Sequence, residues 1–417
     1  MSGLTVTGAR LDGVTVGLRA EAGVIVGLGP DVRPAPGDRV LDAVGATLLP
    51  GMVNAHTHAA MTLFRSWGDD LPLRTWLEER IWPAEARLSA DDVYWGTRLA
   101  CLEMIRSGTT RFVDMYWHPE AVARAVRDSG LRATVCAPLI DRGSAAAMGA
   151  LRDAAESSLE ALDGFCDRVT PALGPHATYT VSAPALAWIG RTAAERGVGI
   201  HVHLAETAWE VRQCREEHGV SPAVLLDRHG LLGAGTVAAH GCWLDDDDLA
   251  LLAERGATIA TCPVSNMKLA VGHDAPYRIV GRHTVALGLG TDGPSSNNSL
   301  DLFQDVKLLA LLHKFLADDP AAMPATEALA IARGQRSPLL GGQPLGVGAP
   351  ADFLLARLEV PELVPGELDA DLVYAATGAV VDTTVVAGEV LMTGRRVEGA
   401  EEVLAEVRAR AERVRTG

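Results

Sequence analysis

Two histidines separated by a single residue, His56 and His58, end an apolar run that starts at Leu48. Such a run predicts a buried strand, and side chains at positions i and i+2 of a strand point to the same side. Both imidazoles can therefore reach one metal ion. A His-x-His pair alone is equally typical of two polar residues at a strand end, so the interpretation depends on whether other ligands appear elsewhere in the chain.

Further residues with ligand or acid–base chemistry follow later apolar runs. Of eight strand-like runs between residues 48 and 292, four end in histidine, although the chain contains only 12 histidines. Glu206 stands three residues after one of them, and the eighth run ends in Asp292. The histidines at these ends are His56, His58, His176, His203 and His240. No role is assigned to the histidines expected in helices or loops, which are His118, His218, His229, His273, His283 and His313.

The strand-like runs alternate with helical stretches. Strands are expected over 48–56, 109–116, 132–139, 169–176, 198–206, 236–241, 258–263 and 285–292, and helices over 91–107, 119–129, 145–162, 183–196, 209–229 and 245–255. Glycines that suit the left-handed cap follow four of the helices, at Gly108, Gly130, Gly197 and Gly256. This alternation predicts a (β/α)₈ barrel, whose chemistry gathers at the carboxyl ends of the strands. A doubly wound sheet is the alternative, but no Gly-x-Gly-x-x-Gly loop follows the first strand.

A metal ion fits the residues at the strand ends. Imidazole nitrogens and carboxylate oxygens suit zinc, and iron less commonly. We expect one divalent ion, most often Zn²⁺ with Fe²⁺ as the alternative, held by His56, His58, His203 and Asp292 with an open position for water. His201 lies deeper in its strand and is expected to pack or to support a ligand. Glu206 beside this site can shuttle a proton; the alternative is a carboxylate that only starts a helix.

Composition and the two ends of the sequence indicate the domain organisation and limit the classes of partner. Short apolar runs broken by Gly, Pro and Asp at both ends predict a small β-sandwich built from 1–46 and 347–417, with a charged helix over 400–415 and the barrel over 47–346. The net charge of −16 argues against nucleic-acid binding. Six scattered cysteines predict free thiols. Because neither a signal peptide nor an apolar run long enough for a membrane is visible, we expect a cytoplasmic protein without membrane contact.

Several longer motifs resemble one protein superfamily. They cover residues 50–58, 76–78 with 82–85, 107–110, 114–116, 174–176, 203–207, 262–269 and 290–298. Together they resemble the amidohydrolase superfamily and, within it, the 5-methylthioadenosine/S-adenosylhomocysteine deaminases. The resemblance implies a metal-dependent hydrolytic deaminase that converts an adenine nucleoside (methylthioadenosine, S-adenosylhomocysteine, 5′-deoxyadenosine or adenosine) into the inosine-type product and ammonia. It also implies a small-molecule nucleoside as partner and a homo-oligomer.

The resemblance implies roles for individual residues. Besides binding the metal, Asp292 would take a proton from the metal-bound water. Glu206 would protonate the purine ring nitrogen, and His240 would steady the attacking hydroxide. The paired oxygens of the Glu85 carboxylate suit the two ribose hydroxyls. The residues that would line the nucleoside pocket with Glu85 and Glu206 are Trp76, His176 and Ser296.

Two other interpretations stay open. One is another hydrolase of this superfamily that acts on a free heterocycle, such as a guanine-type or pterin deaminase or a triazine chlorohydrolase. Glu85 discriminates against it, since such substrates lack a ribose diol. The other is a non-catalytic metal-binding protein, in which Glu206 and His240 would add nothing to a closed site of four ligands. An assay of ammonia release separates these interpretations.

A departure from the family pattern predicts the preferred 5′ group. The family often carries an arginine after the third strand that meets the carboxylate of the homocysteine tail, and the matching residue here is Ala137. Losing that contact should weaken binding of the charged tail by roughly 1.5–3 kcal/mol. Asp141 nearby adds repulsion, while Arg142 and Arg152 are the two candidates for compensation.

We therefore expect uncharged 5′ groups, as in methylthioadenosine, 5′-deoxyadenosine and adenosine, to be preferred over S-adenosylhomocysteine. The measurement is kcat/KM for methylthioadenosine and for S-adenosylhomocysteine, in the parent and in Ala137→Arg. The new arginine should raise kcat/KM for S-adenosylhomocysteine alone. A parent enzyme that already favours S-adenosylhomocysteine contradicts the prediction.

Overall fold

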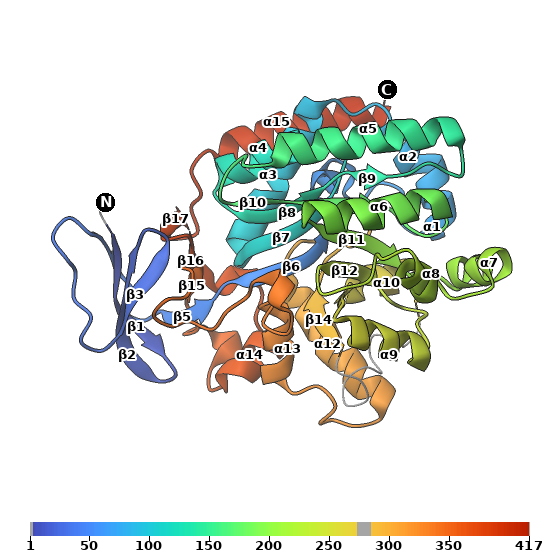
Figure 1. Ribbon diagram of the computed structural model, residues 1–417. Helices are drawn as coiled ribbons and strands as arrows, with labels where there is room; N and C mark the ends of the chain where they lie inside the picture. Colours follow the sequence, from blue (N-terminus) through green and yellow to red (C-terminus); the bar gives the residue numbers. More distant parts are fainter. Residues whose placement is uncertain (1–2, 273–284, 417) are drawn as a thin grey trace.

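A parallel barrel wrapped by helices and a smaller sheet beside it make up the computed structural model, which describes residues 3–272 and 285–416 (Figure 1). Neighbouring barrel strands pair in sequence order and in parallel. They are β6 (Met52–Thr57), β7 (Thr109–Met115), β8 (Arg132–Cys136), β10 (Val169–Pro175), β11 (Gly199–Leu204), β12 (Thr236–His240), β13 (Thr258–Thr261) and β14 (Ala286–Leu289). A short strand, β9 (Pro138–Leu139), also pairs with β10.

Hydrogen bonds bring the last barrel strand back to the first. Just after β14, the Asp292 backbone N–H donates to the His56 carbonyl at 3.0 Å. Within the same junction, the Thr291 N–H donates to Asn54 Oδ1 at 3.0 Å, and Asn54 Nδ2 donates to Thr291 Oγ1 at 2.8 Å. The barrel is therefore nearly closed. This confirms the predicted (β/α)₈ architecture and excludes the doubly wound alternative.

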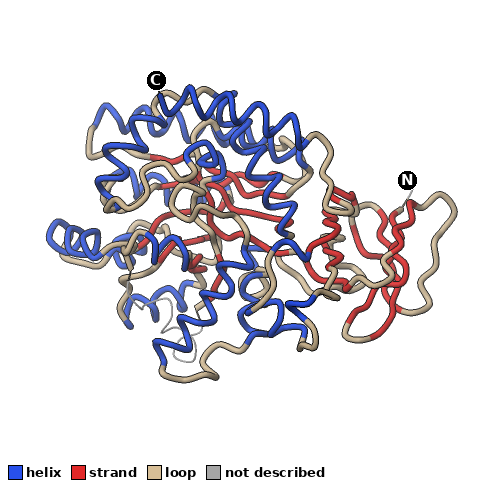
Figure 2. The backbone as a smooth tube through the Cα atoms, turned by 180° about the vertical axis from the view of Figure 1, so that it is seen from behind, coloured by secondary structure: helices blue, strands red, loops and turns tan. Residues whose placement is uncertain are grey.

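Helices surround the strands, as Figure 2 shows from behind. The principal helices are α3 (Ala90–Ser107), α4 (Pro119–Ser129), α5 (Ala145–Leu162), α6 (Ala183–Arg196), α7 (Ala208–His218), α8 (Pro222–Arg228), α9 (Asp246–Arg255), α10 (Pro263–Lys268), α12 (Leu302–Ala317), α13 (Ala325–Ala332), α14 (Leu368–Tyr374) and α15 (Ala400–Thr416). Serine, threonine or aspartate caps the amino ends of α3, α5, α6, α7, α8 and α9. The four glycines predicted as carboxyl caps have left-handed φ angles, which confirms that prediction.

Three predicted elements are each divided in the structure, and the first of them is the strand expected over 132–139, which forms β8 and β9. The helix expected over 209–229 was wrong as one element, because Gly219 ends α7 with φ +71° and Ser221, followed by Pro222, caps the start of α8. The strand expected over 48–56 was also wrong as one element. It divides at Gly51 into β5 (Thr47–Pro50) and β6, and these belong to different sheets. A single apolar run thus leaves the small sheet and becomes the first strand of the barrel.

The small sheet joins both ends of the chain. Its order is β17-β16-β15-β5-β1-β2-β3, with β4 paired to β1. The amino-terminal strands are β1 (Leu4–Leu11), β2 (Val14–Glu21), β3 (Val24–Gly29) and β4 (Arg39–Asp42), and the carboxyl-terminal strands are β15 (Phe353–Ala356), β16 (Val381–Val386) and β17 (Glu389–Met392). The two groups meet where β5 pairs antiparallel with β15. Leu18, Ile25, Leu48 and Phe353 are fully buried in its core.

The carboxyl-terminal helix returns from the small sheet to the barrel, and in Figure 1 the chain ends beside the barrel helices. Near its end, Arg415 donates to the carbonyls of Leu63 at 3.0 Å and Arg65 at 2.7 Å. Leu63 belongs to the 3₁₀ helix η1 (Ala59–Phe64), which begins directly after His58. The last turn of the chain therefore braces the segment that follows the predicted metal ligands. No helix in the described ranges is long and apolar enough to cross a membrane.

The close packing around Gly51 predicts that one methyl group added at this position destabilises the protein. A Cβ at Gly51 would lie 2.3 Å from Oγ1 of Thr110, which is 3 % exposed. Gly51→Ala should lower the free energy of unfolding by about 1–3 kcal/mol through overpacking. Adding Thr110→Ala should recover part of the loss, because it removes Oγ1 and Cγ2, the two atoms that lie closest to the added methyl group.

Gly149→Ala is the matched control, because an added Cβ at this position of α5 meets no heavy atom within 4 Å. It should be neutral or stabilise the protein by up to about 1 kcal/mol. Denaturant unfolding of the four proteins checks the prediction, and a Gly51→Ala variant that unfolds with the parent contradicts it.

Candidate active site

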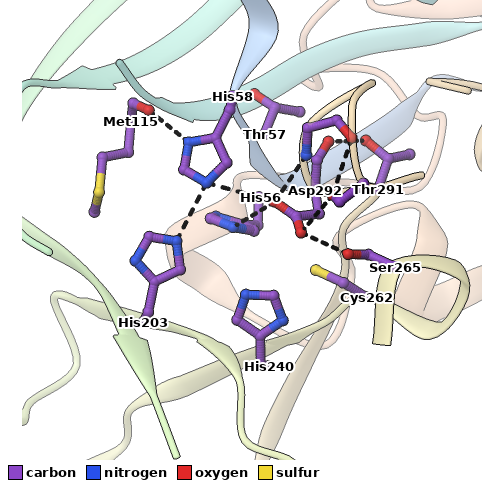
Figure 3. A network of polar contacts seen from close by, with 12 residues as sticks. His56, Thr57, His58, Met115, His203, His240, Cys262, Ser265, Thr291 and Asp292 are labelled. Atoms are coloured by element: carbon purple, nitrogen blue, oxygen red, sulfur yellow. Dashed lines mark hydrogen bonds and ion pairs between the residues drawn. The ribbon is translucent and has the colours of Figure 1, made fainter. Parts of the chain in front are cut away.

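Histidines and one aspartate converge at the carboxyl ends of the barrel strands (Figure 3). Asp292 Oδ1 lies 3.4 Å from Nε2 of both His56 and His58, and His58 Nε2 lies 3.2 Å from His203 Nε2. The His240 ring stacks at a centroid distance of 5.6 Å from that of His203. All five side chains expected to meet here therefore do meet. Of the histidines without an assigned role, His273 and His283 lie outside the described residues.

The outer nitrogen of each ring fixes how the ring is turned. His58 Nδ1 donates to the Met115 carbonyl at 2.7 Å, and His203 Nδ1 donates to the His176 carbonyl at 2.7 Å. Because a carbonyl can only accept, each ring carries a proton on Nδ1, and the Nε2 lone pair of the neutral ring is then free. The two free lone pairs face each other across the centre of the cluster.

His201 fixes the orientation of the His56 ring, and it is itself anchored to a backbone carbonyl. His201 Nδ1 donates to the Val237 carbonyl at 3.2 Å, so its Nε2 can accept from His56 Nδ1, 2.7 Å away. The proton on His56 is thereby placed on Nδ1 and its Nε2 faces the cluster. His201 thus orients the His56 ring, which agrees with the supporting position expected for it deeper in the strand.

This donor set fits a divalent metal ion. His56 Nε2 is buried and has no hydrogen-bond partner among the described residues. Burial also lowers the pKa of His56 to about 4, so the ring is neutral near pH 7. Several lone pairs and a carboxylate oxygen that face one point without a proton between them suit a cation, and nitrogen–oxygen donors suit zinc.

The carboxylate of Asp292 is held from two sides. Its Oδ1 accepts from the Gly293 N–H at 2.7 Å, and its Oδ2 accepts from Ser265 Oγ at 2.6 Å and Ser296 Oγ at 2.8 Å. Burial opposes the charged form, but His56 and the surrounding imidazoles hold the pKa of Asp292 well below its ordinary value. Ser296, which the resemblance places in the substrate pocket, lies buried behind Asp292 and not on the pocket wall.

His240 and Glu206 face the cluster from neighbouring strands. His240 ends β12 with φ +70°, and its Nδ1 donates to Asn266 Oδ1 at 2.8 Å. Burial opposes protonation of His240, but the charges of Glu206 and Asp292 raise its pKa. Burial raises the pKa of the Glu206 carboxyl. No role was predicted from the sequence for Asn266 or Ser265. Both lie in the 262–269 motif, which is the one sequence feature that could have pointed to them.

A narrow cavity of about 80 Å³ opens beside the cluster. The wall residues that the sequence had singled out are His58, Trp76, Glu85, His176, His203, Glu206, His240 and Asp292. Trp76 and Glu85 come from a segment that lines the cavity, formed by α1 (Leu73–Trp76), the π-helical turn η2 (Leu77–Ile81) and α2 (Trp82–Glu85). Burial raises the pKa of Glu85, and the Trp117 indole N–H, which donates to Glu85 Oε2 at 3.3 Å, partly offsets this effect.

A wider cavity of about 800 Å³ adjoins the first one. The two share the wall residues Leu73, Leu77, Trp82 and Tyr179. Arg142 lines the wider cavity with its guanidinium 5.0 Å from the Trp82 ring centre. Arg152, the other arginine considered for a charged 5′ tail, packs on Trp188 instead.

Comparison with known proteins supports this picture. The model of the amidohydrolase family matches residues 47–391. The chain is 47% identical over 379 residues to a 5′-deoxyadenosine deaminase of Methanoregula boonei, covering 90% of this chain and 86% of that protein. It is 44% identical over 388 residues to a 5-methylthioadenosine/S-adenosylhomocysteine deaminase of Moorella thermoacetica, covering 89% and 88%. A crystal structure of an adenosine deaminase from Xanthomonas campestris with bound zinc superimposes with a TM-score of 0.89 at 33% identity, covering 100% of this chain and 99% of that one.

The geometry of the cluster predicts the metal content of the protein. Protein purified without chelator should hold about one equivalent of a divalent metal per chain, with zinc expected to predominate. A His56→Ala/His203→Ala double variant should lose it, because it removes two of the converging nitrogens. His229→Ala, at the end of α8, is the control and should keep the parent content. Elemental analysis gives the answer, and stoichiometric metal in the double variant contradicts the assignment.

Proposed function

This chain belongs to the amidohydrolase family, and from that premise we propose that it is a metal-dependent hydrolytic deaminase of adenine nucleosides. One pocket carries the proposal, because its wall combines the imidazole–carboxylate cluster, a buried acid at Glu206 and a second carboxylate at Glu85. The names of the two relatives described above, a 5′-deoxyadenosine deaminase and a 5-methylthioadenosine/S-adenosylhomocysteine deaminase, support the same class of substrate.

The metal would be held by His56, His58, His203 and Asp292, and zinc is the ion that their donor atoms suit best. When bound, such an ion lowers the pKa of a water to near 7 and so supplies the nucleophile. The unpartnered Nε2 of His56 and the supporting bonds of the other rings favour this arrangement.

The side chains around the cluster would move the protons of the reaction. The water oxygen bonds to C6 of the purine, the C6–amino bond breaks, and the products are the 6-oxo purine and ammonia. Asp292 accepts one proton from the attacking water and passes it to the amino group, which leaves as ammonia. Glu206, whose raised pKa favours the protonated form, gives its proton to the ring nitrogen and regains one from the C6 hydroxyl as this becomes the 6-oxo group. His240 is anchored through Nδ1 to Asn266, so its Nε2 is directed toward the attacking oxygen.

Glu85 would recognise the sugar. Its carboxylate lies on the wall of the same pocket, where the Trp117 indole N–H donates to Oε2 and the Tyr116 side chain lies nearby. A vicinal diol can donate to both oxygens. Trp76 and His176 on this wall would pack against the nucleoside. For the 5′ position we propose a preference for uncharged groups, which the identity with the 5′-deoxyadenosine deaminase supports.

Truncating Glu85 should separate nucleoside substrates from free bases. Each ribose hydroxyl that loses its acceptor costs roughly 1–3 kcal/mol. Glu85→Ala should therefore lower kcat/KM for adenosine and methylthioadenosine by about tenfold or more per hydroxyl, and change the rate with free adenine far less.

Glu79→Ala is the control, because Glu79 is exposed in the same segment and lines neither cavity. It should leave both rates unchanged. An assay of ammonia release with nucleosides, free bases and triazines supplies the rates. Equal losses for nucleoside and base in Glu85→Ala would point to a free-heterocycle hydrolase instead.

A further inference from the structure

Glu210 is a buried acid that the reaction itself does not use. It occupies the third position of α7 and is 1 % exposed. A glutamate at this position of a helix usually reaches back to the backbone N–H of the capping residue, which here is Thr207. The Glu210 carboxylate reaches further. Its Oε1 accepts from the Ala205 N–H at 3.1 Å, and its Oε2 accepts from the Glu206 N–H at 2.9 Å.

The turn that these two bonds hold is a strained one. Ala205 has φ +49°, a left-handed conformation that residues with a side chain adopt only when their surroundings fix it. The turn connects His203 at the end of β11 to Glu206 on the pocket wall. Without an acceptor, the two backbone N–H groups of this turn would be buried and unsatisfied, and the strained conformation would lose its support.

The same carboxylate also joins a second loop of the pocket. Thr178 Oγ1 donates to Glu210 Oε1 at 3.2 Å. Thr178 stands two residues after His176, which lies on the pocket wall and accepts the His203 Nδ1 proton at its carbonyl. Glu210 thus contacts both loops while its own side chain lies outside the pocket wall.

We propose that Glu210 is the positioning residue of the proposed acid Glu206, and that it acts by accepting the backbone N–H groups of Ala205 and Glu206 with its two carboxylate oxygens. This inference rests on the proposed function, because it concerns how the Glu206 side chain is oriented. The positioning role requires a side chain with two acceptor atoms. Glutamine has nearly the same shape but offers one oxygen and one NH₂ group, so one backbone N–H would face another donor.

The experiment is a double-mutant cycle in the full-length enzyme, with Glu206→Gln, Glu210→Gln and the double variant. Glu206→Gln should lower kcat by about 100-fold or more, because glutamine cannot carry the proton. Glu210→Gln should lower kcat by about 10- to 100-fold with little change in KM, because Glu206 is displaced. In the Glu206→Gln background, Glu210→Gln should cause no further loss, since its effect passes through a proton that is already missing.

The control variant is Glu216→Gln, which changes an exposed glutamate on the same helix and should behave as the parent. Metal content and thermal stability are measured on each protein. If Glu210→Gln does not fold, Thr178→Val provides the second test. It removes one bond to Glu210 and should lower kcat by about two- to fivefold, again only when Glu206 is present.

The outcomes separate the inference from the function on which it rests. Near-normal turnover in Glu206→Gln overturns the acid assigned to the reaction, and the positioning role with it. A slow Glu206→Gln variant beside a normal Glu210→Gln variant overturns the positioning role alone. A Glu210→Gln loss of the same factor in both backgrounds also overturns it, because a general structural defect does not depend on Glu206.

Discussion

The site depends on one constraint: each imidazole that faces the cluster must keep its inner lone pair free. The constraint is met because each ring carries its proton on the outer nitrogen and donates it in a hydrogen bond to an acceptor there. The acceptors of His58 and His203 are main-chain carbonyls at the ends of β7 and β10, and that of His56 is His201, itself anchored to β12. The register of the barrel strands therefore determines which nitrogen of each ring carries the proton.

The backbone around the site is held in conformations that it would not choose alone. Ala205, His240 and Asp292 all have positive φ angles and follow or end the barrel strands β11, β12 and β14. Such conformations persist where surrounding bonds over-determine them. Asn266 anchors the His240 ring, two serine hydroxyls hold the Asp292 carboxylate, and Glu210 holds the turn at Ala205. The supporting residues are thus as specific to the site as the groups that face the pocket.

Much of this arrangement could be predicted from the sequence, because the barrel repeats a simple pattern. Alternating apolar runs and helices gave the strands, and residue types at strand ends gave the converging cluster. The break at Gly51 could not be predicted, since both halves of that run are similarly apolar and the pairing of β5 with β15 and β1 is what separates them. Glu210 reads in sequence as an ordinary capping glutamate, because its two acceptor bonds depend on how the preceding turn folds. Ser296 came from a resemblance, and the structure places its hydroxyl on Asp292 instead of on the pocket wall.

The path of the chain also bears on the order in which the protein is made. His56 and His58 leave the ribosome early, yet β5, which leads into their strand, finds its antiparallel partner only when residues 353–356 are synthesised. The segment after His58 receives its brace from Arg415, almost at the end of the chain. Because synthesis runs from the amino end, two of the four proposed metal ligands are made long before the segments that secure them. A nascent chain therefore carries these histidines long before their surroundings are in place.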